Sequence, residues 1–265
     1  MKSNISQKEI ASGKKIVDIL SLSNPQLLPN LLKKDIPKYQ SFSNTGKYEL
    51  WSSTKSKFKN TKKYDKIIML TSGLAASGKD SIYSEMVKLY PDLFFKTITA
   101  TSRPIRDGEV DKTDYFFIKT VKKFKKAIKN QEFLEFIKRG DNYYGLPKIS
   151  LDRAIDQSNP VIYCQIEMSG WSKLTKYIAS LKNKKILIIK AFILPDMSFL
   201  EYISWLKEKR ANEDLDSRIN KTGWEIKKAP VKSDFIIINQ IRNDISTLTS
   251  TAQTIIDQLL DFLPN

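Results

Sequence analysis

A short glycine-rich segment restricts the possible folds of this chain more than its other motifs do. Residues 73–79 read Gly-Leu-Ala-Ala-Ser-Gly-Lys, which is the pattern G-x-x-x-x-G-K. An apolar run at 67–70 precedes the segment, and an amphipathic stretch that ends before Pro91 follows it. A strand, a glycine-rich loop and a helix in this order predict a phosphate-binding loop, because backbone N–H groups and the helix dipole converge there on a phosphate.

The loop also predicts individual contacts to a nucleotide. Lys79 is expected to reach the β- and γ-phosphates. The residues expected to contact the phosphates of a bound nucleotide are Gly73, Ala75, Ala76, Ser77, Gly78, Lys79, Asp80 and Ser81. Asp80 stands where this motif usually has Ser or Thr, so the Asp80 carboxylate or the Ser81 hydroxyl is expected to ligate Mg²⁺. In the alternative interpretation, the charge of Asp80 weakens nucleotide binding.

The rest of the chain predicts the sheet around this loop. Further apolar runs of strand length lie at 161–166, 186–194 and 235–238. Helical patterns accompany them at 151–157, 198–209, 213–229 and 246–262. Strands that alternate with helices indicate a parallel sheet with helices on both faces. We therefore predict a three-layer α/β/α fold with a parallel sheet core.

Residues 1–65 differ from this domain. Ser6 is expected to cap a helix that runs to Leu20, and a second short apolar segment lies at 27–32, so the pattern predicts a mainly helical extension. A lysine-rich stretch at 55–63 joins this extension to the main domain. We favour a solvated linker for the lysine-rich stretch, and a nucleic-acid-binding arm is the alternative.

Composition excludes several classes of chemistry. The sequence has no histidine and a single cysteine, Cys164, so Ser-His-Asp triads, Cys-His dyads, His-ligated zinc and an internal disulfide are excluded. Cys164 lies in an apolar run, where we expect a buried and inert thiol. No stretch approaches the ~20 apolar residues that span a bilayer, and the N-terminus lacks the apolar core of a signal peptide. We therefore expect a cytoplasmic protein with no membrane partner.

The net charge of +16 favours an anionic ligand, and the arginines indicate where it would bind. The first 102 residues contain lysine but no arginine. Arg103 and Arg106 then occur three residues apart beside Pro104, so their planar forks can converge on one phosphate. The alternative is that both pair on the surface with Glu109 and Asp111.

From residue 66 onward the sequence resembles guanylate kinases. Besides the phosphate-binding loop, the resemblance rests on Thr-Ala-Thr-Ser-Arg-Pro-Ile-Arg at 99–106, Asn-Gln-Glu-Phe-Leu-Glu-Phe at 130–136 and Gly-Asp-Asn-Tyr-Tyr-Gly at 140–145. It implies an enzyme that transfers the γ-phosphoryl group of ATP to GMP with Mg²⁺. The parts it implies are a loop, strand and helix at 66–98, a small β-rich GMP-binding subdomain at 99–150 and a helical lid at 198–220, within a domain spanning 66–265.

The resemblance also implies roles for single residues. Those that would bind GMP are Thr99, Arg103, Arg106, Tyr115, Glu135, Tyr144 and Glu167. Those that would act in catalysis are Lys79, Arg103, Arg210 and Arg218. The lid arginines would stabilise charge on the transferring phosphoryl group. Pairing with neighbouring carboxylates on a helix surface is the alternative for both.

The chemistry of guanine is compatible with these assignments. Guanine presents N1–H and N2–H₂ as adjacent donors, so the Glu135 carboxylate can accept from both while the Thr99 hydroxyl donates to O6. Adenine lacks this pattern and would leave Glu135 without its partners. A solvated carboxylate at a helix end is the alternative for Glu135.

Four departures from the family pattern accompany the resemblance. Asp80 is the first, and Leu146 is the second, because it replaces a Ser or Thr and so removes a polar contact to the base. Gln165 and Glu167 replace two aspartates, and the lid is shorter by about two residues and lacks a glycine. A kinase for another nucleoside monophosphate and a non-catalytic domain that binds phosphopeptides or proteins therefore remain as alternatives, although the intact loop favours an enzyme.

Overall fold

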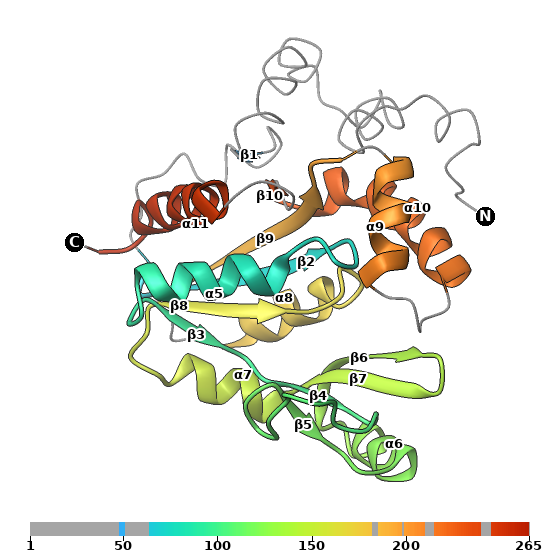
Figure 1. Ribbon diagram of the computed structural model, residues 1–265. Coiled ribbons are helices and arrows are strands. Elements are labelled where there is room, and N and C mark those ends of the chain that lie inside the picture. Colours follow the sequence, from blue (N-terminus) through green and yellow to red (C-terminus); the bar gives the residue numbers. More distant parts are fainter. Residues whose placement is uncertain are drawn as a thin grey trace. The chain divides into compact units, whose positions relative to one another are not determined.

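The computed structural model describes residues 48–50, 64–181, 185–197, 199–209, 215–239 and 245–264 (Figure 1). The helical extension and the lysine-rich stretch predicted within 1–65 lie outside the described residues. A short strand from that region, β1 (Tyr48–Leu50), is described. The proposed roles of residues 1–65 therefore stay predictions.

The described chain forms two compact units. The first comprises Thr71–Pro91 and Ile189–Phe262 together with β1, and the second comprises Tyr64–Leu70, Asp92–Ile188 and the C-terminal end. The strands β2 (Lys66–Gly73) and β9 (Ile186–Pro195) contribute residues to both units. Both are mostly buried, as expected for strands read from continuous apolar runs.

The larger sheet has six strands in the order β1-β10-β9-β2-β8-β3. Its other strands are β3 (Phe94–Lys96), β8 (Val161–Gln165) and β10 (Phe235–Asn239). β10 pairs with β9 in parallel, and β3 pairs with β8 in parallel. The predicted parallel sheet core is confirmed, and β1 adds an antiparallel edge strand beside β10.

The first unit holds the helices α5 (Lys79–Leu89), α9 (Phe199–Lys209), α10 (Leu215–Lys232) and α11 (Ile245–Leu260). α5 packs against α11, and the two lie side by side in Figure 1. Ile82 and Met86 of α5 are fully buried. The Thr249 hydroxyl of α11 donates to the Glu85 carboxylate of α5 at 2.6 Å, and this bond lowers the pKa of Glu85. A partly buried polar contact therefore joins α5 to α11, which pack against each other.

The second unit contains a smaller sheet of four strands in the order β5-β4-β7-β6. The strands are β4 (Thr99–Thr101), β5 (Tyr115–Phe117), β6 (Phe133–Arg139) and β7 (Asn142–Pro147). β4 pairs with β5 in parallel, whereas β7 is antiparallel to both β4 and β6. This sheet lies within the segment 99–150 that the sequence predicted to form a small β-rich subdomain.

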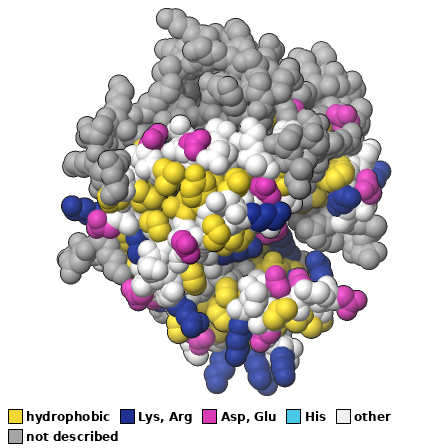
Figure 2. Space-filling model, turned by 60° about the vertical axis from the view of Figure 1, so that its left-hand side comes forward, with side chains coloured by type: hydrophobic (Ala, Val, Ile, Leu, Met, Phe, Trp, Pro, Cys, Tyr) yellow, Lys and Arg dark blue, Asp and Glu magenta, His cyan; other side chains and the backbone are white. Residues whose placement is uncertain are grey.

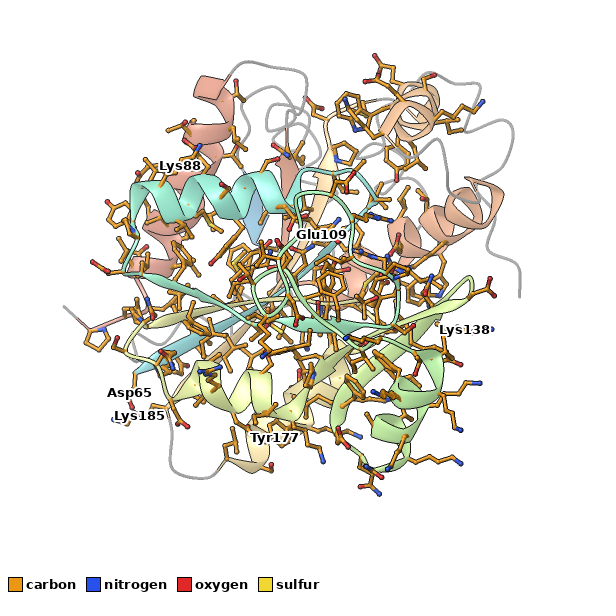
Figure 3. All side chains as sticks on the ribbon, turned by 60° about the horizontal axis from the view of Figure 1, so that its bottom comes forward. Asp65, Lys88, Glu109, Lys138, Tyr177 and Lys185 are labelled. Carbon is orange, nitrogen blue, oxygen red and sulfur yellow. The ribbon has the colours of Figure 1, made fainter. Side chains whose placement is uncertain are left out.

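Three helices accompany the smaller sheet: α6 (Val121–Lys129), α7 (Lys148–Ile155) and α8 (Trp171–Ser180). Tyr177 of α8, labelled in Figure 3, donates its hydroxyl to the Asp152 carboxylate of α7 at 2.6 Å. α6 buries Phe124 and Ala127. Its exposed residues are Lys122, Lys123, Lys125, Lys126 and Lys129. Lysine and arginine side chains gather at the lower edge of the view in Figure 2, the level at which α6 lies in Figure 1.

Cys164 is buried in β8, as the sequence predicted. Burial raises the pKa of its thiol to about 12, so the thiolate needed for reactivity is not populated near neutral pH. None of the helices in the described part of the chain has the length and apolar character that crossing a bilayer requires.

Candidate functional site

The glycine-rich segment forms the predicted turn between β2 and α5. Gly73 ends β2, and a Cβ atom at this position would lie 2.5 Å from the carbonyl oxygen of Ile193 on β9, so no larger residue fits. Gly78 precedes α5 with φ 79°, in the left-handed region that favours glycine. Ala76 also has a positive φ, of 54°, which is unusual for a residue with a side chain. The loop is therefore tightly curled, and its geometry requires both of its glycines.

The Lys79 ammonium lies over this loop. Its Nζ atom donates to the carbonyl oxygens of Leu74 at 2.6 Å and Gly73 at 3.1 Å. A cation held at the concave side of a phosphate-binding loop is placed to meet an incoming phosphate. Asp80 and Ser81 follow on the first turn of α5 and are exposed.

Three side chains that were not among the predicted site residues donate hydrogen bonds to backbone carbonyl oxygens of the loop. Tyr202 and Trp205 of α9 donate to the carbonyl oxygens of Ala75 and Ala76 at 3.1 and 3.0 Å. Asn239, at the end of β10, donates to the carbonyl oxygen of Ser77 at 3.0 Å. No local pattern in the sequence indicates these contacts, because each joins residues more than 120 positions apart.

Arg103 lies in the second unit and is only 7% exposed. Its two terminal nitrogens donate to the two carboxylate oxygens of Glu109 at 2.6 and 2.5 Å. Figure 3 labels Glu109, which lies on the segment between β4 and β5. The bonds from Arg103 lower the pKa of Glu109. In the alternative interpretation, Arg103 pairs with Glu109 on the surface. The pair is present, but Arg103 is buried, so the pair is not a surface ion pair.

The Arg103 guanidinium lies among aromatic rings. Its central carbon is 5.1 Å from the ring centre of Tyr115 and 5.5 Å from that of Phe117. The Tyr115 and Tyr144 rings meet edge to face, with their centres 6.3 Å apart. Three of the four residues predicted to hold the GMP phosphate are thus close together. Arg106 is exposed, and its backbone N–H donates to Glu109 at 2.9 Å.

Asp111 was the second carboxylate expected to pair with the arginines in the alternative interpretation, but its carboxylate bonds to the backbone instead. One oxygen of its carboxylate accepts a hydrogen bond from the backbone N–H of Phe117 at 3.0 Å. Asp111 also forms an isolated bridge with Tyr115. Asp111 therefore helps to fix the loop that leads into β5, which carries the predicted phosphate-binding tyrosine.

Glu135 is buried on β6 with 5% exposure, so a solvated helix-end carboxylate was the wrong alternative. Gly170 packs directly against it. A Cβ atom at Gly170 would lie 2.9 Å from Cγ and 3.2 Å from Cδ of Glu135. Thr99 begins β4 and is half-buried. Leu146, the second family departure, pairs with Glu135 from the neighbouring strand β7 and is fully buried.

Glu167 forms an ion pair with Arg139, the last residue of β6. The Arg139 guanidinium lies 5.6 Å from the ring centre of Tyr144. Arg139 was not among the predicted site residues, although it is one of only seven arginines in the chain. Its position between Glu135 and Tyr144 in the sequence was the available signal. The ion pair fixes the Glu167 carboxylate, which was expected to bind GMP.

The two predicted lid arginines are not both described. Arg210 lies outside the described residues. Arg218 lies on α10. Their predicted roles in catalysis, and the lid itself, stay predictions.

Comparisons with known proteins show the family to which this chain belongs. A family model described as guanylate kinase matches residues 64–258. The guanylate kinase of Carboxydothermus hydrogenoformans is 30% identical over 191 residues, which cover 72% of this chain and 87% of that protein. The guanylate kinase of Paramagnetospirillum magneticum is 28% identical over 174 residues, which cover 65% of this chain and 77% of that protein.

A solved structure shares the fold. The crystal structure of guanylate kinase from Anaplasma phagocytophilum aligns with a TM-score of 0.52 at 20% identity and covers 76% of this chain and 88% of its own. Because the family model matches well over half of the sequence, this chain belongs to the guanylate kinase family.

Proposed function

We propose that this chain transfers the γ-phosphoryl group of ATP to the phosphate of GMP. An oxygen of the GMP phosphate forms a bond to the γ-phosphorus while the bond from that phosphorus to the β,γ-bridging oxygen breaks, and ADP leaves with the bonding electrons. The nucleophile is already anionic, so no histidine base is needed. Catalysis then depends on positioning two polyanions and on stabilising their charge.

The phosphate-binding loop is the ATP side of this proposal. Its backbone N–H groups and Lys79 bind the β- and γ-phosphates. The Lys79 ammonium now donates to the Leu74 carbonyl at 2.6 Å and would exchange that bond for a phosphate oxygen. Phosphate oxygens are the stronger acceptors because they carry charge.

The first turn of α5 is suited to Mg²⁺. Mg²⁺ prefers oxygen ligands and is commonly held by one or two carboxylates together with substrate phosphates and water. Among the described residues, no group of three or more acidic or cysteine side chains is arranged to hold a metal ion by itself. We assign Asp80 and Ser81 as its protein ligands, where the metal would neutralise charge on the β- and γ-phosphates.

The GMP phosphate is assigned to Arg103, Arg106, Tyr115 and Tyr144. Arg103 is oriented in advance by its two bonds to Glu109, and Tyr115 and Tyr144 border its guanidinium. A phosphate would add charge-assisted bonds from Arg103 and from the exposed Arg106 fork. Preorganisation of this kind reduces the entropy lost on binding.

Guanine recognition is assigned to Glu135, with Thr99 donating to O6. The single observation that carries this assignment is the burial of Glu135 against Gly170, because a buried carboxylate discriminates strongly between a base that supplies two donors and one that supplies none. Glu167 is assigned a supporting role beside the base, held by Arg139.

A coupled assay of ADP formation tests the proposal. With ATP and Mg²⁺ present, GMP and dGMP are the expected acceptors. IMP lacks the N2 amino group and should show kcat/KM lower by about 10- to 100-fold, since one bond to Glu135 is lost. AMP and pyrimidine monophosphates should give no activity above background. A preference for AMP or a pyrimidine would instead support the alternative kinase, and no acceptor at all would support a non-catalytic binding domain.

Gly170→Ala should raise the KM for GMP by about tenfold, which corresponds to about 1.4 kcal/mol. The added methyl group cannot coexist with the present position of the Glu135 side chain, so the carboxylate must move. The KM for ATP should not change. Ser169→Ala, at the exposed neighbouring position, is the matched control and should leave both constants unchanged. An unaltered KM for GMP in Gly170→Ala would contradict the role of Glu135.

We also propose a cytoplasmic location, with ATP and GMP as the small-molecule partners. The exposed lysines of α6 support the view that much of the positive charge is solvated surface. Nucleic-acid binding by residues 1–65 remains the separate alternative for that segment.

A further inference from the structure

Three successive carbonyl groups of the phosphate-binding loop are held from outside by side chains of other elements. Ala75 accepts from the Tyr202 hydroxyl, Ala76 from the Trp205 indole and Ser77 from the Asn239 amide, all at 3.0–3.1 Å. Tyr202 and Trp205 lie three residues apart on α9, so one face of this helix supplies both donors. Tyr202 is fully buried.

These bonds also determine where the loop N–H groups point. A trans peptide is planar and directs its N–H opposite to its carbonyl, and the described chain has no cis peptide. Fixing the Ala75 and Ser77 carbonyls therefore turns the N–H groups of Ala76 and Gly78 away from α9 and β10. A phosphate-binding loop works only if its N–H groups converge on the ligand and its carbonyls do not.

The hydrogen bond from Trp205 is made to Ala76, a loop residue with an unusual backbone conformation. Ala76 has φ 54°, a conformation that residues with a side chain adopt only when their surroundings hold them there. Trp205 donates to the carbonyl of Ala76 itself. Its ring also lies under the Lys209 ammonium, 4.5 Å from the ring centre, and this contact helps to keep the indole in place.

We propose that Tyr202 and Trp205 are positioning residues for the ATP phosphates, and that α9 serves as the external brace of the phosphate-binding loop. This inference rests on the proposed function, because it takes the loop to be the ATP site. Without these donors, the Ala75 and Ala76 peptides can rotate and present their carbonyl oxygens to the phosphates. Nucleotide binding would then have to reverse this rotation, at a cost in affinity.

Tyr202→Phe and Trp205→Phe test the inference, since each removes one donor and keeps an aromatic ring. Calorimetric titration with MgADP should show Kd raised by about fivefold in each variant, the value of one neutral hydrogen bond. The double variant should show a larger increase. GMP affinity, titrated separately, and the KM for GMP should stay within twofold of the unaltered chain.

Trp171→Phe is the matched control. Trp171 is buried in α8 of the second unit, whereas the loop belongs to the first unit. It should lower the unfolding midpoint in urea at least as much as Trp205→Phe, without changing the Kd for MgADP. This comparison separates a loss of loop geometry from a general loss of stability.

The outcomes are distinct. A raised Kd for MgADP with unchanged GMP affinity supports the brace. An unchanged Kd for MgADP in the double variant, with normal binding by the unaltered chain, overturns the brace and leaves the proposed function intact. A failure of the unaltered chain to bind MgADP overturns the proposed function and the brace together.

Discussion

Replacing Lys79 by alanine is expected to lower kcat for GMP-dependent ADP formation by about a thousandfold. The ammonium donates to the loop carbonyl oxygens of Leu74 at 2.6 Å and Gly73 at 3.1 Å, so it is held at the loop. Charge on the γ-phosphoryl group is stabilised chiefly by such fixed cations, and losses of 10²–10⁵ are typical when one is removed. Single-turnover measurements with saturating ATP and GMP give this number directly.

Lys88→Ala is the control for that experiment. Lys88 lies on the same helix, and its side chain is 64% exposed, so its removal should change kcat by less than twofold. Both variants should retain the circular dichroism spectrum of the unaltered chain. If Lys79→Ala kept more than a tenth of the activity, the loop would not be the site of phosphoryl transfer.

Arg103→Lys is expected to lower kcat/KM for GMP by about 100- to 1,000-fold, or about 3–4 kcal/mol. The guanidinium fork now bonds to both oxygens of Glu109 while its face lies against Tyr115. A lysine is a point charge and cannot bond to Glu109 in this two-pronged way while also reaching a phosphate. The KM for ATP should remain unchanged, because Arg103 is assigned to the GMP phosphate and not to ATP binding.

The matched control is Arg153→Lys. Arg153 lies on α7 in the same unit and is exposed, so this change should have no effect on either substrate. Equal losses for ATP and GMP in Arg103→Lys would indicate general damage to the fold. A normal kcat/KM for GMP would show that the acceptor phosphate binds elsewhere.

The parts of the fold that the sequence predicted are those with a local signal. β2, β8, β9 and β10 are continuous apolar runs, and the loop that follows β2 has a motif with fixed spacing. β4 and β5 have only three residues each, which is too few for a period to be recognised. They become strands through pairing with each other and, for β4, with β7. Their existence depends on contacts that no short window contains.

In the candidate site, too, residues within local motifs could be predicted, whereas residues that act through distant contacts could not. Arg103 and Tyr144 could be selected because their spacing and neighbours form motifs. Arg139 could not be connected to Glu167, because their ion pair joins positions 28 residues apart and only Glu167 lies in a recognised motif. Trp205 was read only as part of an expected lid, whereas its indole donates to the loop carbonyl of Ala76. Side chains that act on the backbone of a distant segment leave no pattern that periodicity or spacing detects.

Cys164 makes the chain convenient for site-specific chemistry. It is the only cysteine in the sequence, and its buried thiol, with a pKa of about 12, will not react with maleimides under native conditions. A cysteine introduced at one exposed position in each unit would therefore be labelled selectively without first removing the native one. Paired fluorophores at such positions would report the distance between the two units through each turnover.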